Sequence, residues 1–288
     1  MHIPIAAYVR SNYRRVVPER YRAKIRRYRE NIARLPYNAE YGEGYLGPKG
    51  WYLSRAKQTS VDGSGPVPWI TYPTRMMLER VLSPDMHVFE YGSGNSSLWW
   101  AGKVAKVISI EHDQEFAAKL KVEAPSNLTI VHRGFDAPFL DEDGLLASFL
   151  EANFDLPKFG APQWEDYHGL LCREFAAYAL EFTKHESRTF DVVVIDGMAR
   201  VLCCWVVSRL IKQSGIIVFD NADRWHYNPG FRILANAGFR RIDFYGTGPI
   251  NAYEWCTSIF ARDLERFARN VEIPKHQKSD INSLTQGL

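Results

Sequence analysis

The stretch FEYGSGNSS, residues 89–97, decides the fold of this chain. It starts inside an apolar run, HVFEY at 87–91, which predicts a short strand, and it leads into SSLWWAGK at 96–103, which predicts a helix. Gly92 and Gly94 stand between the two, and glycine both tolerates positive φ and lets the backbone approach a bound molecule. The free N–H groups at the helix start favour a polar ligand group. Together these features predict a binding site for a nucleotide-type ligand.

The alternation of strand and helix continues along the chain. Apolar, β-branched runs predict further strands at 107–111, 127–133, 191–196 and 215–220, with helices at 113–122, 199–212 and 229–238. Such an order is typical of an α/β fold with a doubly wound, mostly parallel sheet. Two more predicted strands, 240–246 and 256–262, are joined by a loop and are expected to pair antiparallel at one edge.

The length of 288 residues allows one large domain with extensions. We expect a basic helical extension at 1–49, a main domain at 50–262 and a polar tail at 263–288. Residues 36–68, rich in Gly, Pro and Tyr, are expected to form a loop or cap. The segment 136–188 is longer than one helical connection needs, and either a substrate lid or a surface insertion would account for it.

Composition and cysteine usage are those of a cytoplasmic protein. No run of 18 apolar residues is present, so no membrane span is expected, and no secretory signal is expected at the N-terminus. Four cysteines lack metal-binding spacing and two of them are adjacent, which favours reduced thiols: Cys172, Cys203, Cys204 and Cys256.

Two ligand classes compete for the glycine turn. A nicotinamide dinucleotide would use the pattern GxGxxG, with Ser97 at its last position, and it needs a cradle for its pyrophosphate. S-adenosylmethionine has no phosphate and carries an ammonium group instead. Glu90, two residues before Gly92, is a carboxylate suited to that ammonium, directly or through water. Glu90 therefore favours the methyl donor.

A second carboxylate supports an adenosine-containing ligand without choosing between the two classes. Glu111 ends the next predicted strand, 19 residues after Gly92, where a carboxylate accepts hydrogen bonds from both ribose hydroxyls. His112 follows it, and it either borders the adenine or is an ordinary loop histidine.

The strings FEYGSGNSS, ISIEHD, FDVVVIDG and GIIVFDNADR, in that order, resemble the class I S-adenosylmethionine-dependent methyltransferases. Within that class the chain is most similar to bacterial small-molecule and glycan-associated O-methyltransferases, over residues 50–262. The resemblance implies a Rossmann-like, seven-stranded sheet with one antiparallel strand near the C-terminus. It also implies that the donor is held by Glu90, Tyr91, Gly92, Ser93, Gly94, Ser96, Glu111, His112 and Asp196. Ser96 stands where the family often has glycine.

Acidic residues mark the ends of two further predicted strands. Asp196 ends one, and Asp220 and Asn221 end the next, so their side chains are expected at the same edge of the sheet. Their oxygens suit Mg²⁺, and the arrangement is similar to the metal-dependent catechol-type O-methyltransferases. There the metal lowers the pKa of a substrate hydroxyl and orients it.

The chain departs from that group just after Asp196. The group usually has a lysine base three residues further on, whereas this chain has Ala199 there, followed by Arg200. Arginine stays protonated, so it is a poor base and is expected to orient an acidic substrate or neutralise a carboxylate. The sequence thus names Asp196, Arg200 and Asp220 as catalytic candidates and leaves metal dependence open.

The basic excess of the chain lies near its N-terminus. Residues 10–34 contain ten basic and two acidic side chains, whereas the whole chain carries a net charge of only +3. Such a segment can contact an anionic membrane surface as a peripheral protein does, although a solvated helix packed on the main domain is favoured. Nucleic acid is a weaker expectation, because no RNA-binding module accompanies it.

The sequence therefore predicts O-methylation of a small hydroxylated acceptor, such as a sugar or glycan precursor. A nicotinamide-dependent oxidoreductase and a non-catalytic binding protein with the same fold are the alternatives. Nothing in the sequence encodes the acceptor or the oligomeric state.

Overall fold

The computed structural model of the protein describes residues 46–152, 174–186 and 188–265. Its centre is a seven-stranded sheet with the order β5-β4-β3-β6-β7-β9-β8. The strands from β5 to β7 are parallel to one another, while β9 runs antiparallel to both of its neighbours. The bounds are β3 His87–Tyr91, β4 Lys106–Glu111, β5 Leu128–His132, β6 Val192–Ile195, β7 Ile216–Phe219, β8 Arg240–Gly246 and β9 Trp255–Ala261. This topology confirms the predicted fold class.

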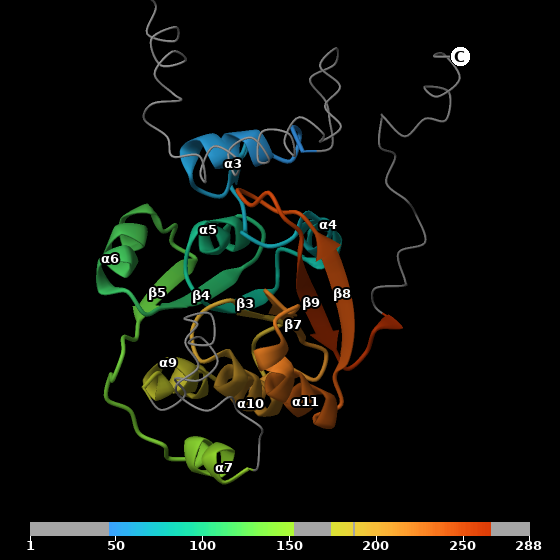
Figure 1. Cartoon of the computed structure of the whole chain (residues 1–288). Coiled ribbons are helices and arrows are strands. Elements are labelled where there is room, and N and C mark those ends of the chain that lie inside the picture. Colours follow the sequence, from blue (N-terminus) through green and yellow to red (C-terminus); the bar gives the residue numbers. More distant parts are fainter. Residues whose placement is uncertain (1–45, 153–173, 187, 266–288) are drawn as a thin grey trace, which may run out of the picture.

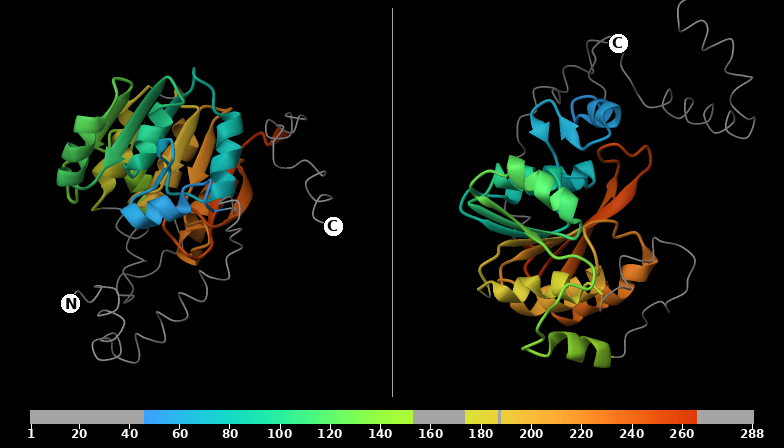
Figure 2. Two further views of the ribbon diagram at one scale, coloured as in Figure 1. Left: turned by 90° about the horizontal axis from the view of Figure 1, so that it is seen from above. Right: turned by 90° about the vertical axis from the view of Figure 1, so that its left-hand side faces the viewer.

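Helices cover both faces of the sheet and make three layers (Figures 1 and 2). One face carries α4 (Tyr72–Val81), α5 (Asn95–Ala101) and α6 (Gln114–Glu123). The other carries α9 (Ala176–Leu180), α10 (Arg200–Leu210) and α11 (Asn228–Asn236), with α7 (Leu145–Glu151) further out on the same side. Short 3-10 turns, η2 (Glu181–Lys184) and η3 (Trp225–Tyr227), complete the connections.

The alternation of side chains along β3 explains why the sheet is buried on both faces. Val88 packs with Trp100 in the cluster beneath α4, α5 and α6, whereas Phe89 and Tyr91 pack with Tyr178 in the cluster on the α9–α11 face. Successive strand residues point to opposite faces, so an apolar run buries surface in both layers. A strand covered by helices on both faces exposes no side chains to water, so it can consist almost entirely of apolar residues. For this reason the apolar runs in the sequence indicated the strands of the sheet.

The order of the strands creates a ligand crevice beside β3. The chain runs from β3 outward through β4 to β5, then crosses back to β6 on the other side of β3. The connections after β3 and β6 therefore diverge to opposite faces, into α5 and α10. In open α/β sheets, ligands bind at the carboxyl ends of strands at such a switch point.

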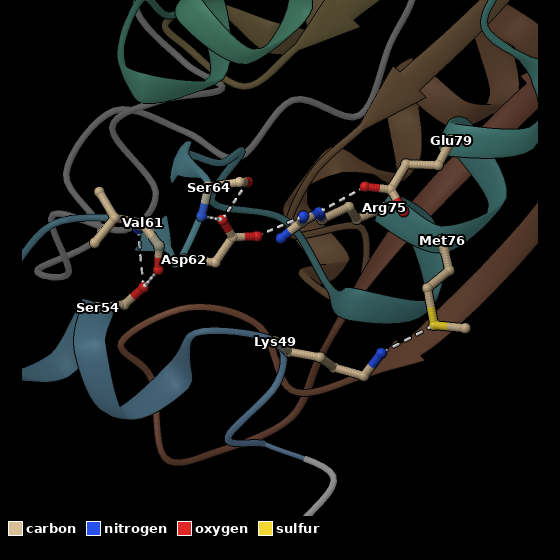
Figure 3. A network of polar contacts seen from close by, with 8 residues as sticks. All are labelled: Lys49, Ser54, Val61, Asp62, Ser64, Arg75, Met76 and Glu79. Atoms are coloured by element: carbon tan, nitrogen blue, oxygen red, sulfur yellow. Dashed lines mark hydrogen bonds and ion pairs between the residues drawn. The ribbon is translucent and has the colours of Figure 1, made fainter. Parts of the chain in front are cut away.

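The described part of the region expected to be loop, residues 46–68, contains regular structure. It forms α3 (Trp51–Lys57) and a hairpin of β1 (Val61–Asp62) and β2 (Gly65–Pro66). Figure 3 shows the ion pair that fastens this unit to α4, in which Arg75 Nη2 lies 2.6 Å from Asp62 Oδ2. Within α4, Arg75 Nε also lies 3.0 Å from Glu79 Oε1. The high glycine and proline content of this segment had favoured a loop prediction. These short elements place residues 58–60 beside the crevice.

Several predictions concern residues outside the described ranges. The basic segment 10–34 with its expected membrane contact lies there, as do most of the tail 263–288 and residues 153–173 of the insertion. These predictions, and the domain boundaries, stay predictions. None of the helices in the described ranges is long and apolar enough to cross a bilayer.

Candidate functional site

A pocket of about 420 Å³ opens at the switch point, a volume typical of small-molecule sites. Its walls come from the turn after β3, the end of β4 and the loop after β6. Seven of the residues predicted for the site line this pocket: Gly92, Ser93, Gly94, Ser96, Glu111, His112 and Asp196. Residues far apart in the sequence thus meet where the resemblance placed the ligand.

Gly92 is required by close packing as well as by its backbone conformation. Its φ is 98°, and a Cβ atom there would come within 2.9 Å of the main chain at Asp196 and Gly197. Its N–H donates to the Ile110 carbonyl at 2.9 Å, which ties the turn to β4. The turn after β3 can therefore lie directly against the loop after β6, and this contact forms the floor of the pocket.

Glu111 is held in place by the main chain. Its Oε1 accepts hydrogen bonds from the N–H groups of His112 and Asp113, both at 2.8 Å, and Oε2 accepts one from Ser93 N–H at 3.2 Å. His112 Nδ1 also lies 2.8 Å from Oε1, and this contact raises the pKa of the His112 imidazole. The carboxylate is therefore fixed in one orientation, and its Oε2 accepts only one long hydrogen bond. Such a group can accept hydrogen bonds from the two hydroxyls of a vicinal diol.

Glu90 lies beneath the turn and does not line the pocket. The residue is fully buried, and its oxygens accept hydrogen bonds from Ser97 Oγ at 2.5 Å, Ser109 Oγ at 2.7 Å and Trp100 Nε1 at 3.0 Å. Burial raises the pKa of the Glu90 carboxyl, while these bonds oppose the rise. In this structure Glu90 anchors the start of α5, so the expected contact with the ligand's ammonium stays a prediction.

Tyr91 does not line the pocket, and its expected contact with the donor stays a prediction. The ring is fully buried on the opposite face of the sheet, and its hydroxyl donates to the Ala179 carbonyl at 2.7 Å. The reason is the period of two in a strand: Tyr91 must face away from Glu90 and from α5.

Asp196 is the predicted catalytic residue that reaches the pocket. Its side chain is 26% exposed and lines the pocket beside Gly197 and Met198. Burial raises the pKa of Asp196 to about 6, against the lowering effect of the Arg200 guanidinium. Such a carboxyl group can accept a proton near neutral pH.

Arg200, the first residue of α10, lies behind Asp196 and is 4% exposed. Its Nη2 donates to Asp196 Oδ1 at 2.9 Å and to the Asp196 carbonyl at 2.8 Å. Its Nη1 donates to the Asp220 carbonyl at 2.6 Å and approaches Asn221 Oδ1 at 3.4 Å, while Nε donates to the Gly197 carbonyl at 2.9 Å. The guanidinium thus joins the ends of β6 and β7 from inside the protein.

The Asp220 carboxylate is hydrogen-bonded to side chains of β9. Its Oδ1 accepts hydrogen bonds from Trp255 Nε1 at 2.9 Å and Thr257 Oγ1 at 2.5 Å, and the residue is 3% exposed. Burial, together with the charge of Asp196, raises the pKa of Asp220 to about 7. Neither Asp220 nor Arg200 lines the pocket.

The expected Mg²⁺ site at Asp196, Asp220 and Asn221 does not fit this geometry. A cation, the Arg200 guanidinium, already contacts the Asp196 carboxylate and the Asn221 amide oxygen, and the Asp220 carboxylate is turned to other partners. The metal site stays a prediction, since sequence spacing gives the strand end that a residue occupies but not the direction of its side chain.

The structure also adds pocket walls that the sequence did not indicate. Thr59 and Ser60 line the pocket from above, held by Asn95 Nδ2 at 2.9 Å and 2.8 Å. Trp69 and Phe116 line it with rings that are 43% and 44% exposed. A sequence signal did exist for Phe116, because it is an apolar residue on the otherwise polar first turn of the helix that follows Glu111. The residues before the first predicted strand of the sheet, which include Thr59, Ser60 and Trp69, carried no comparable signal.

No protein-family model matches the sequence, and no curated protein matches it either. Among solved structures, the chain is similar to precorrin-8w decarboxylase from Methanobacterium thermoautotrophicum, with 12% identity, 71% of this chain and 97% of that chain covered, and a TM-score of 0.41. It is also similar to precorrin-6y C5,15-methyltransferase from Geobacter metallireducens, with 15% identity, 72% and 95% coverage and a TM-score of 0.41. A third similar structure is that of a methyltransferase-like protein from Silicibacter pomeroyi, with 18% identity, 77% of this chain and 94% of that chain covered, and a TM-score of 0.40. The fold assignment rests on the strand order of the sheet itself.

Proposed function

We propose that this protein transfers a methyl group from S-adenosylmethionine to a hydroxyl group of a small acceptor. The observation that carries the proposal is the charge of the pocket. Its lining includes the carboxylates of Glu111 and Asp196 and no lysine or arginine among the described residues. A dinucleotide brings two phosphates, which such a lining repels, whereas S-adenosylmethionine brings a sulfonium and an ammonium, which it attracts.

The residues of the pocket fit the donor group by group. Glu111 would accept hydrogen bonds from the ribose hydroxyls, and Phe116 offers an apolar face beside His112 for a base. The turn at Gly92 lets the main chain come close to the ligand. When bound, the donor supplies a methyl carbon on positively charged sulfur, which becomes a neutral thioether once that carbon–sulfur bond breaks.

Asp196 is the base in this proposal. The acceptor oxygen forms its bond to the methyl carbon and passes its proton to the Asp196 carboxylate. Because the carboxyl has a pKa raised to about 6, it is ionised at neutral pH and still basic enough to share the proton. Asp196 also lies in the same pocket as Glu111, so donor and acceptor would be held together, which removes much of the entropic barrier.

A sugar or glycan precursor is the acceptor class that we favour. The pocket rim carries the half-exposed ring of Trp69, and a flat aromatic face packs well against the C–H face of a sugar ring. The carboxylates Glu111 and Asp196 favour an acceptor without negative charge near the reacting hydroxyl.

The test is a transfer assay with donor labelled in its methyl group. The acceptor panel contains neutral sugars and nucleotide sugars, catechols and primary amines, and the variants are Asp196→Asn and the exposed Asp143→Asn as control. We expect label on a hydroxylated acceptor, loss of transfer in Asp196→Asn and normal transfer in Asp143→Asn. Label on amines alone would contradict the choice of oxygen, and donor binding without transfer to any acceptor would support the binding-protein alternative.

A further inference from the structure

The buried junction behind the pocket already contains a cation. Five oxygen atoms converge on the Arg200 guanidinium: the carbonyls of Asp196, Gly197 and Asp220, and the side-chain oxygens of Asp196 and Asn221. These come from the ends of two neighbouring strands, β6 and β7, and from the loop between β6 and α10. Carbonyl, carboxylate and amide oxygens are the ligands of hard divalent cations, so the set resembles a metal cage filled by a side chain.

The local backbone places the guanidinium there. Ala199 has a left-handed φ of 46° as the N-cap of α10, and Arg200 follows as the first helical residue. The Arg200 guanidinium lies over the rings of Phe219 and Tyr227, whose centroids lie 5.9 Å and 5.4 Å from its Cζ. Packing against these rings, which are fully buried, fixes the side chain in one orientation.

A divalent cation could not share this junction. It would have to take the Asp196 and Asn221 oxygens from the guanidinium and would then lie within a few ångströms of a fixed positive charge. Like charges at that distance repel strongly where water is excluded. The Asp220 carboxylate, which would be needed for compensation, is bonded to Trp255 and Thr257 on β9.

We propose that the Arg200 guanidinium takes the place of a divalent cation at the ends of β6 and β7, and that methyl transfer in this protein needs no metal. Arg200 is then a positioning residue: it fixes the Asp196 carboxylate at the pocket floor through Oδ1 and leaves Oδ2 for the acceptor hydroxyl. The inference rests on the proposed methyl transfer for its catalytic part and on geometry alone for its metal part.

The metal part is tested with Mn²⁺ alone, by electron paramagnetic resonance on the full chain. We expect no saturable binding by the wild type up to millimolar Mn²⁺, and saturable binding by Arg200→Ala, in which the oxygen cage is left empty. The exposed Arg232→Ala is the matched control and should behave as the wild type does. Saturable binding by the wild type that Asp196→Asn abolishes would overturn the inference, and so would a folded Arg200→Ala that binds no Mn²⁺.

The positioning part is tested by kinetics with and without chelator. Wild-type activity should be unchanged in excess chelator. Arg200→Ala should lose about 100-fold in kcat, the loss expected from a small misplacement of a reacting group, while its affinity for the donor is retained. Arg200→Lys, which keeps the charge, should recover part of that loss and also serves if Arg200→Ala fails to fold. Equal losses in kcat and donor affinity, or activity that requires added metal, would contradict the assignment. Absence of donor binding in the wild type would instead refute the proposed function and leave the Mn²⁺ result intact.

Discussion

The two edges of the pocket use carboxylates in opposite ways. At the end of β4, Glu111 is held by main-chain N–H groups, so its geometry follows from the backbone. At the end of β6, Asp196 is held by the side chain of Arg200, which comes from the following helix. The main-chain contacts at the first edge follow from strand and turn patterns, whereas the side-chain partner at the second edge does not.

The same difference suits the two edges to different tasks. A carboxylate fixed by three main-chain N–H groups, as Glu111 is, suits an acceptor for a ligand's hydroxyls, as expected at the donor end. A carboxylate that is 26% exposed and has a pKa raised to about 6 can change its protonation near neutral pH, as expected at the acceptor end. The edge at Glu111 is called the binding edge and the edge at Asp196 the reacting edge. Asp196→Asn and Glu111→Gln separate the two, whereas Gly92→Ala is expected to disrupt both.

The largest effect is expected from Gly92→Ala, which should disrupt both edges at once. The new Cβ would lie 2.9 Å from the main chain of the loop after β6, at a φ that alanine disfavours. We expect the free energy of unfolding to fall by roughly 2–4 kcal/mol and donor binding to be lost. Urea unfolding and titration calorimetry measure the two. The control is Gly63→Ala, where the Cβ has open space; equal behaviour of the two variants would contradict the packing argument.

Asp196→Asn should affect the reacting edge alone. Removing a general base typically lowers the rate by about 10²–10⁴-fold, so kcat should fall by that factor while donor affinity changes little. Steady-state kinetics and donor titration separate the two quantities, with the exposed Asp143→Asn as control. A parallel loss of donor affinity would assign Asp196 to the binding edge instead.

Glu111→Gln should affect the binding edge alone. A hydrogen bond to a charged group contributes about 1.5–3 kcal/mol, so donor affinity should weaken by roughly tenfold or more. The exposed Glu115→Gln, with the same change of charge on the first turn of α6, should bind as the wild type does. If the rate at saturating donor fell and the affinity did not, Glu111 would have no role in holding the ribose.

The smallest effect is expected from Asp220→Asn, in the dependence of stability on pH. The folded-state pKa of Asp220 is raised to about 7, above its ordinary value, so the folded protein binds more protons and loses stability as pH rises through that range. Between about pH 6 and about pH 8 this amounts to about 1 kcal/mol for one carboxyl group. The amide keeps the acceptor for Trp255 and Thr257, so the variant's stability should change less with pH than the wild type's. A wild-type stability that rises across this interval would contradict the assignment.

The fold was predictable because its strands are buried on both faces. Runs such as VVVI in β6 carry no polar residue, and the glycine turn after β3 separates strand from helix unambiguously. The seven strands and the single antiparallel strand near the C-terminus, β9, were implied by the resemblance and are confirmed. The elements that escaped prediction, α3 and the hairpin of β1 and β2, are short and stabilised by tertiary contacts such as the ion pair of Arg75 with Asp62.

The site was predictable where it depends on strand ends and turns. Gly92 and Glu111 line the pocket for that reason, whereas the Tyr91 ring is buried on the other face of the sheet. One of the two roles expected for Arg200, contact with a carboxylate, is what the structure shows at Asp196. Its main-chain partners could not be predicted, because those carbonyls converge only in the folded sheet. Trp69 is brought to the pocket by a segment that precedes the first sheet strand, so no spacing rule applies to it.

The central claim is that the pocket between Glu111 and Asp196 binds a cationic methyl donor, and calorimetric titration tests it most directly. The folded wild-type protein is titrated with S-adenosylmethionine and, in parallel, with NAD, and the titrations are repeated with Glu111→Gln. We predict saturable micromolar binding of S-adenosylmethionine at one site per chain, weakened in Glu111→Gln, and no binding of NAD. Tight binding of NAD by a protein that gives no heat with S-adenosylmethionine would contradict the account.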